Sequence, residues 1–161
     1  MPTVSGLFRY PVKSLQGRRV PELTLTPSGF EGDRRWALLD VDTGRLMSAK
    51  RWSTLLQASA DDEGIDLPDG ARVTFGDADA DERLSAWLGR EVHLAEADGS
   101  TEVSYEMTFD PPDDEAEYVP IPTPPGSFLD LCVGHLVAEP TLRSASERHP
   151  DLDWDVRRFR P

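Results

Sequence analysis

Short apolar runs separated by glycine and proline fill the first hundred residues of the chain. Residues 3–10 form a mixed apolar and polar run that ends at Pro11, because proline forces the residue before it into an extended conformation and blocks a helix. Residues 20–26 alternate in polarity and close at a Pro-Ser-Gly turn. Runs of this length and punctuation predict strands, so we expect a mainly β protein with a barrel or sandwich at its N-terminus.

The pattern of short predicted strands continues to about residue 97. An acidic run at residues 77–82 predicts the start of a helix in which Leu84, Trp87 and Leu88 lie on one face, and Gly89 ends it. Further strands are predicted within a hairpin at residues 35–49 and at residues 53–58, 65–67, 72–75 and 91–96.

The chain changes character after residue 97. Residues 98–125 are rich in Asp, Glu and Pro, and their prolines predict a long loop without regular structure. Residues 127–138 predict an ordered segment, and a short helix is expected at residues 141–148. We therefore expect three parts: a β-barrel domain at residues 1–97, an acidic loop at residues 98–125, and the incomplete start of a second barrel-like domain at residues 126–161.

Charge is distributed unevenly along the chain. The formal net charge is −13 at pH 7, but residues 1–60 carry 9 Lys and Arg against 5 Asp and Glu, whereas residues 61–154 carry 5 against 24. The last seven residues are basic again. The two ends therefore resemble surfaces that hold an anion, and the acidic middle favours solubility.

Composition excludes several classes of function. A mostly negative field argues against nucleic-acid binding. No apolar run reaches the roughly 18–20 residues that span a bilayer. The single cysteine, Cys132, cannot form an internal disulfide, which is typical of a reducing compartment, so we expect a soluble cytoplasmic protein without a membrane partner. The apolar neighbours of Cys132 predict a buried structural thiol.

Two basic turns carry the candidate site. They are Tyr-Pro-Val-Lys-Ser at residues 10–14 and Gly-Asp-Arg-Arg-Trp at residues 32–36. Only Lys13 and Lys50 are lysines among 17 basic residues, which favours Lys13 as a ligand contact, because lysine is a compact point charge. Two other interpretations stay open: the first turn is an exposed corner with a solvated charge, and the second is a surface cluster of salt bridges.

These turns resemble the MOSC family of molybdenum-cofactor proteins. The resemblance rests on the Tyr-Pro-Val-Lys-Ser corner, the Asp-Arg-x-Trp turn, Ser-Phe-Leu-Asp at residues 127–130, and Asp-Val-Arg-Arg-Phe-Arg-Pro at residues 155–161. It implies a β-barrel N-terminal domain and a bound pterin, the molybdenum cofactor or molybdopterin. Members of this family include amidoxime-reducing enzymes and cofactor sulfurases.

The resemblance also implies the residues of the site. Lys13 and Ser14 match positions that meet the pterin phosphate, and Arg34 and Arg160 match arginines that hold the cofactor. Arg35 and Arg158 are second choices. These groups suit an anion on chemical grounds too, because lysine, hydroxyl and guanidinium groups make charge-assisted hydrogen bonds to phosphate.

The sequence departs from the family at its end. It stops at Pro161, before the Asn and the molybdenum-ligating cysteine of the family. We therefore expect no catalytic residue or metal ligand in this chain and no redox chemistry by it alone, and exposed apolar surface near residues 128–137. Three alternatives remain: the C-terminal MOSC region acts in trans, the chain is a stand-alone small-anion binding or interaction module, or it is a nonfunctional fragment.

Overall fold

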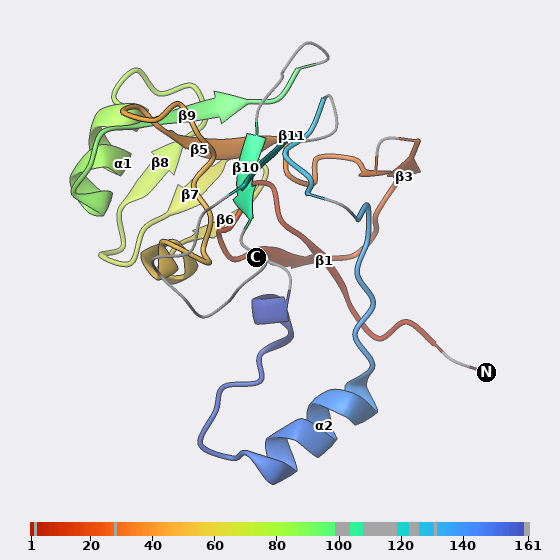
Figure 1. Cartoon of the computed structure of the whole chain (residues 1–161). Coiled ribbons are helices and arrows are strands. Elements are labelled where there is room, and N and C mark those ends of the chain that lie inside the picture. Colours follow the sequence, from red (N-terminus) through yellow and green to blue (C-terminus); the bar gives the residue numbers. More distant parts are fainter. Residues whose placement is uncertain are drawn as a thin grey trace.

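The computed structural model describes residues 1, 3–27, 29–98, 104–107, 119–122, 126–130 and 132–159. Short strands dominate this part of the chain, and only two α-helices accompany them (Figure 1). The prediction of a mainly β protein is confirmed. The strands are β1 (Leu7–Arg9), β2 (Arg18–Val20), β3 (Leu25–Thr26), β4 (Gly29–Phe30), β5 (Trp36–Asp40), β6 (Ser59–Ala60), β7 (Gly64–Asp66), β8 (Arg72–Thr74), β9 (Val92–Glu96), β10 (Ser104–Met107) and β11 (Val119–Pro122). The helices are α1 (Ala80–Leu88) and α2 (Glu139–Arg148), with 3₁₀ turns η1 (Ser53–Gln57) and η2 (Val156–Phe159).

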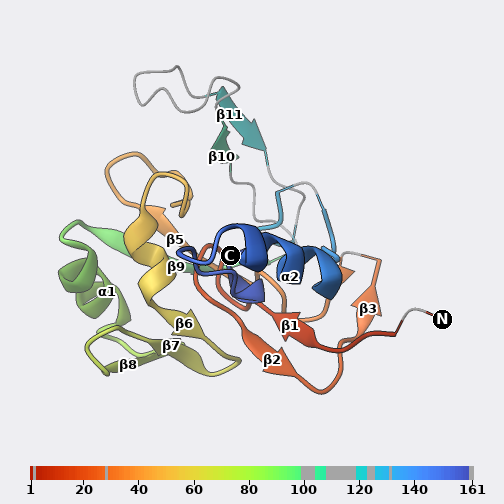
Figure 2. The same cartoon turned by 90° about the horizontal axis from the view of Figure 1, so that it is seen from below.

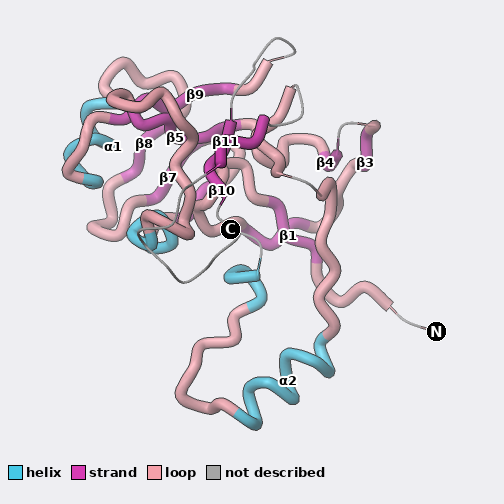
Figure 3. Tube along the Cα trace, viewed as in Figure 1, coloured by secondary structure: helices cyan, strands magenta, loops and turns pink. Residues whose placement is uncertain are grey.

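The strands pair in small antiparallel sheets. β5 pairs with β9, β6, β7 and β8 form a three-stranded sheet, and β1–β2, β3–β4 and β10–β11 form ribbons (Figure 3). Parallel bridges connect Val12 to Trp36 and Gln16 to Ser59, so the chain after β1 runs beside both β5 and β6. These bridges bring the first basic turn against the start of β5.

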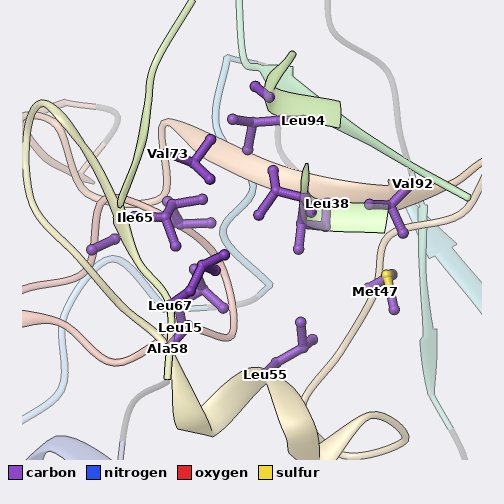
Figure 4. Close-up of a cluster of buried hydrophobic side chains, with 14 residues drawn as sticks. Leu15, Leu38, Met47, Leu55, Ala58, Ile65, Leu67, Val73, Val92 and Leu94 are labelled. Carbon is purple, nitrogen blue, oxygen red and sulfur yellow. The ribbon is translucent and has the colours of Figure 1, made fainter. Parts of the chain in front are cut away.

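One apolar cluster fills the space between these sheets and α1. Leu38 of β5, Ile65 of β7 and Val73 of β8 point into it, and Leu55 closes it from η1 (Figure 4). Leu84 of α1 is fully buried there, which agrees with the predicted face of that helix. Gly89 ends α1, as predicted, and it adopts the left-handed conformation.

One prediction about the first hundred residues is wrong, and another holds over fewer residues than expected. Residues 53–58 do not form a strand, because residues 53–57 form the 3₁₀ turn η1. Leu55 within η1 and Ala58 just after it are buried, and this spacing of three matches a 3₁₀ turn rather than the alternation of a strand. The expected hairpin at residues 35–49 is present but short. Leu39 and Leu46 form an antiparallel bridge, the Asp40 N–H donates to the Arg45 carbonyl oxygen at 2.9 Å, and the Met47 N–H donates to the Leu38 carbonyl oxygen at 2.8 Å. The main partner of β5 is β9, more than fifty residues later, and the local sequence pattern does not reveal such a partner.

The prediction that residues 98–125 lack regular structure is also wrong where the chain is described. β10 and β11 pair antiparallel, and Pro120 and Pro122 lie within β11. Both strands of a two-stranded ribbon are edge strands, and residues two apart turn their nitrogens to the same side. The two prolines can therefore face away from β10 without removing a hydrogen bond of the ladder.

The chain after residue 125 first packs against the strands and then leaves them. Phe128 and Leu129 are buried, so the expectation of exposed apolar surface is wrong for them, whereas Val133 is exposed and Leu136 is 94% exposed. α2 lies below the strands in Figure 1, and none of its residues is buried (Figures 1 and 2). Neither helix in the described residues is long and apolar enough to cross a membrane.

Candidate anion-binding site

The two basic turns lie side by side. The Arg34 N–H donates to the Tyr10 carbonyl oxygen at 2.8 Å, and the Trp36 N–H donates to the Pro11 carbonyl oxygen at 2.9 Å. The Lys13 N–H returns the contact by donating to the Trp36 carbonyl oxygen at 2.8 Å. This backbone ladder places Lys13, Ser14 and Arg34 together, although about twenty residues separate the turns in sequence.

Ser14 and Arg34 have strained backbones. Ser14 has a φ of 67° and Arg34 a φ of 50°, and they are the only non-glycine residues with positive φ in the part of the chain that the structure describes. A side chain in this left-handed region costs roughly 1–2 kcal/mol. Such strain concentrates at functional sites. The strain therefore identifies the contact between the two basic turns as a candidate site, independently of any sequence pattern.

The Lys13 ammonium is buried. The residue is 6% exposed, and Nζ donates to the Phe128 carbonyl oxygen at 3.1 Å and forms an ion pair with Asp130. Burial lowers the pKa of Lys13, and the Asp130 carboxylate opposes this shift only in part. The positive charges of Arg34 and Lys50 lower the pKa further, so the corner concentrates cations.

Arg34 is held by a buried carboxylate. Its Nη1 donates to both oxygens of Asp33 at 2.9 and 3.1 Å, and its guanidinium lies over the Tyr10 ring at 4.8 Å from the centroid. Asp33 also accepts from the Tyr10 N–H at 2.8 Å. Arg34 is therefore fixed by a carboxylate on one side and an aromatic face on the other. The prediction of a surface salt-bridge cluster is wrong for this pair.

The segment at residues 127–130 completes the corner. The Phe128 N–H donates to the Arg34 carbonyl oxygen at 3.0 Å, while the Phe128 carbonyl oxygen accepts from Lys13. Beside it, the Ser127 Oγ is buried without a hydrogen-bond partner among the described residues. An unpaired buried hydroxyl costs free energy, which a ligand at this place would recover. We call Lys13, Ser14, Arg34 and Ser127 the cradle.

The remaining predicted site residues are Arg35, Arg158 and Arg160. Arg35 points outward, with a side chain that is 62% exposed and paired with Glu96, so the structure does not bring it to the cradle. Arg158 belongs to η2, but its side chain lies outside the described part, as does the whole of Arg160. η2 nevertheless reaches this corner, because the Tyr10 hydroxyl donates to the Arg157 carbonyl oxygen at 3.1 Å.

Sequence reasoning missed several contributors. Asp33 and Tyr10 support Arg34, and Ser127 offers the unpaired hydroxyl; all three stand inside the quoted motifs, but nothing local shows that they meet. Lys50 was not among the predicted site residues, yet its positive charge contributes to lowering the pKa of Lys13. Cys132 is exposed, so the predicted buried thiol is wrong. No three His, Cys, Asp or Glu residues among those described are grouped to hold a metal ion.

The buried lysine predicts a pH-dependent stability. Because the folded pKa of Lys13 lies below its ordinary value of 10.5, the unfolded chain binds more protons between these two values. Stability contributed by this group therefore rises with pH across that window. In urea unfolding between pH 7 and 10, the free energy of unfolding of wild type should increase relative to that of Lys13→Met as pH rises. Asp130→Asn removes the negative charge that raises the pKa of Lys13, so the increase in relative stability should begin at a lower pH in this variant. A stability difference between wild type and Lys13→Met that stays constant or falls with pH would contradict the prediction.

A family model with the description MOSC N-terminal beta barrel domain matches residues 1–103. No curated protein gives a significant match to the chain. The family match covers well over half of the sequence, including both basic turns and every strand from β1 to β9. The strands around one core and the buried cationic corner agree with it, and the chain belongs to the MOSC N-terminal β-barrel domain family.

Proposed function

We propose that this chain holds the phosphate of a molybdenum cofactor, using the Lys13 ammonium, the Ser14 and Ser127 hydroxyls and the Arg34 guanidinium. The family match supports a MOSC protein as the setting. The observation that carries the proposal is the coincidence of strain and charge, because both left-handed non-glycine residues, Ser14 and Arg34, flank a buried lysine. Packing alone gives no reason to maintain such a corner.

The donor set fits a phosphate ester. Ammonium, guanidinium and hydroxyl groups all donate to anionic oxygens, and the unpaired Ser127 Oγ is available as an additional donor. Asp33 and Asp130 already balance the cations, so the folded chain does not need the ligand to neutralise them. An anion would therefore share these donors with the carboxylates, which favours reversible binding over permanent binding.

Each residue has a separate task in this proposal. Asp33 and the Tyr10 ring orient the Arg34 guanidinium before the ligand arrives, which reduces the entropy lost on binding. Lys13 would hold its proton more tightly beside a phosphate, because a nearby negative charge raises its pKa. The cofactor supplies the oxo-molybdenum redox centre when bound. The contribution of this chain is to bind and orient the anionic end of the pterin.

Ser14→Gly separates the binding role from folding. Glycine adopts positive φ without strain, so this variant should fold at least as stably as wild type while lacking one phosphate donor. We expect molybdopterin at a hundred times its Kd to stabilise wild type by about 2.7 kcal/mol, read as a rise of several degrees in Tm. The rise should be clearly smaller for Ser14→Gly at the same ligand concentration.

Arg35→Ala is the matched control, because it removes a neighbouring arginine that points away from the cradle. It should retain the wild-type response. Inorganic phosphate serves as a second probe: a response to phosphate equal to that for molybdopterin would favour a general small-anion module. Equal molybdopterin shifts in wild type and Ser14→Gly, or none in either, would remove the cradle from the proposal.

A further inference from the structure

The carboxylates that balance the cradle, Asp33 and Asp130, are held very differently. The Asp33 side chain is 3% exposed, and it accepts from the Arg34 guanidinium and from the Tyr10 N–H. The Asp130 side chain is 39% exposed, and it pairs with the Lys13 ammonium. Asp33 can turn away only by leaving buried donors without this acceptor, whereas Asp130 can turn into solvent.

Lys13 would keep its position if Asp130 turned away. Its ammonium donates in more than one direction, and one hydrogen bond runs to the Phe128 carbonyl oxygen at 3.1 Å. That carbonyl is itself fixed, because the Phe128 ring is fully buried and the Phe128 N–H donates to the Arg34 carbonyl oxygen at 3.0 Å. Movement of the Asp130 side chain would therefore leave the lysine and the backbone around it in place.

The buried ammonium needs an anion beside it. Burial lowers the pKa of Lys13, because the charged form is poorly solvated there, and the Asp130 carboxylate opposes this shift. The Lys13 side chain is only 7% exposed, so water cannot substitute for a counter-charge. Phosphate oxygens accept from an ammonium in the same way as carboxylate oxygens do. A bound phosphate can therefore take over the role that Asp130 has in the ligand-free chain.

We propose that Asp130 is a displaceable counter-ion, which pairs with Lys13 in the ligand-free chain and turns into solvent when a phosphate oxygen takes its place. Asp33 stays with Arg34 in both states. The inference rests on the proposed function, since it requires that Lys13 contacts the phosphate. It makes Asp130 a residue that sets the affinity of the cradle without touching the ligand, because every anion must first break the same ion pair.

Exchange and simple repulsion predict different results. If Asp130 leaves, breaking its pair with Lys13 costs the same free energy for every anion, so removing the carboxylate tightens the binding of all anions by one factor. If Asp130 stays beside the ligand, its repulsion grows with the charge of the ligand, so its removal favours a dianion over a monoanion. Methyl phosphate and dimethyl phosphate distinguish these cases, because a phosphate monoester carries about 1.5 to 2 negative charges at pH 7 and a diester carries one.

Calorimetric titration of wild type and Asp130→Asn with both esters, at pH 7 and constant ionic strength, tests the exchange. We expect Asp130→Asn to bind each ester about tenfold more tightly than wild type, as for the removal of one competing charge-assisted hydrogen bond. The factor should be the same for the two esters. Asp130→Glu keeps the carboxylate and should bind both esters as wild type does.

Glu96→Gln is the matched control. The Glu96 side chain is 40% exposed and pairs with Arg35, which points away from the cradle. This variant therefore changes the net charge by the same amount as Asp130→Asn and removes a carboxylate of similar exposure. It should leave both affinities unchanged, and a gain equal to that of Asp130→Asn would assign the effect to net charge and overturn the exchange.

NMR of the carboxyl carbons in wild type gives a test that needs no variant. Saturating methyl phosphate should move the Asp130 resonance toward its value in the urea-unfolded chain and change that of Asp33 less. A larger change at Asp33, unchanged or weaker binding by Asp130→Asn, or a larger gain for methyl phosphate than for dimethyl phosphate would each overturn the exchange and leave the phosphate site intact. Absence of methyl phosphate binding to both wild type and Asp130→Asn would instead remove the phosphate site itself, and the exchange with it.

Discussion

Asp33→Ala should lower the free energy of unfolding by about 3–5 kcal/mol, the typical cost of removing one partner from a buried ion pair. The Asp33 side chain is 3% exposed and accepts from both the Arg34 guanidinium and the Tyr10 N–H. Its removal deprives a buried cation of its nearest counter-charge and a buried N–H of its acceptor. Neither group can turn to solvent without opening the contact between the two basic turns.

Two further variants separate the causes. Asp33→Asn can keep the hydrogen bond to Tyr10 while losing the charge, so its stability should lie between those of wild type and Asp33→Ala. Asp155→Ala breaks a similar carboxylate–arginine pair, with Arg157, where the partners are partly exposed. That change should cost no more than about 1 kcal/mol. Urea unfolding followed by circular dichroism measures all three, and equal losses for Asp33→Ala and Asp155→Ala would contradict burial as the cause.

Arg34 and Arg35 show which features of the site can be predicted from the sequence and which cannot. The sequence places both in one turn and predicts a cationic corner, which the structure supports through Lys13, Ser14 and Arg34. It does not distinguish a surface cluster from a buried pair. The left-handed backbone of Arg34 turns its side chain toward Asp33 and Tyr10, while Arg35 points toward Glu96. That choice depends on backbone geometry and long-range packing.

The fold was predictable where its signals are local. The α1 face and its Gly89 end follow from residue spacing and glycine conformation, and both are confirmed. The pairing of β5 with β9 and the burial of Phe128 were not predictable. The partner strand of β5, and the buried residues Ala37 and Leu46 that pack with Phe128, lie more than fifty residues away in sequence. The predicted division at residues 97 and 125 remains a prediction, and Phe128 provides its sharpest test.

Phe128→Ala should also lower the free energy of unfolding, by about 3–5 kcal/mol, as is usual for truncating a fully buried phenylalanine. The ring packs with Ala37 and Leu46, which belong to the first hundred residues. The backbone of Phe128 is hydrogen-bonded to both Arg34 and Lys13, so the cavity left by the ring would form directly beside the cradle. The neighbouring strands can fill such a cavity only if the hydrogen bonds from Phe128 to Arg34 and Lys13 shift or break.

The shape of the transition decides between two organisations of the chain. If residues 126–130 fold as one unit with the strands, Phe128→Ala should shift a single cooperative transition and weaken molybdopterin binding together with it. Leu136→Ala, a truncation of an apolar side chain that is 94% exposed, should change neither. An unshifted main transition in Phe128→Ala would mean that residues 126–130 are energetically independent of the barrel. Because Lys13 and Arg34 contact this segment, that outcome would also remove its contribution to the cradle.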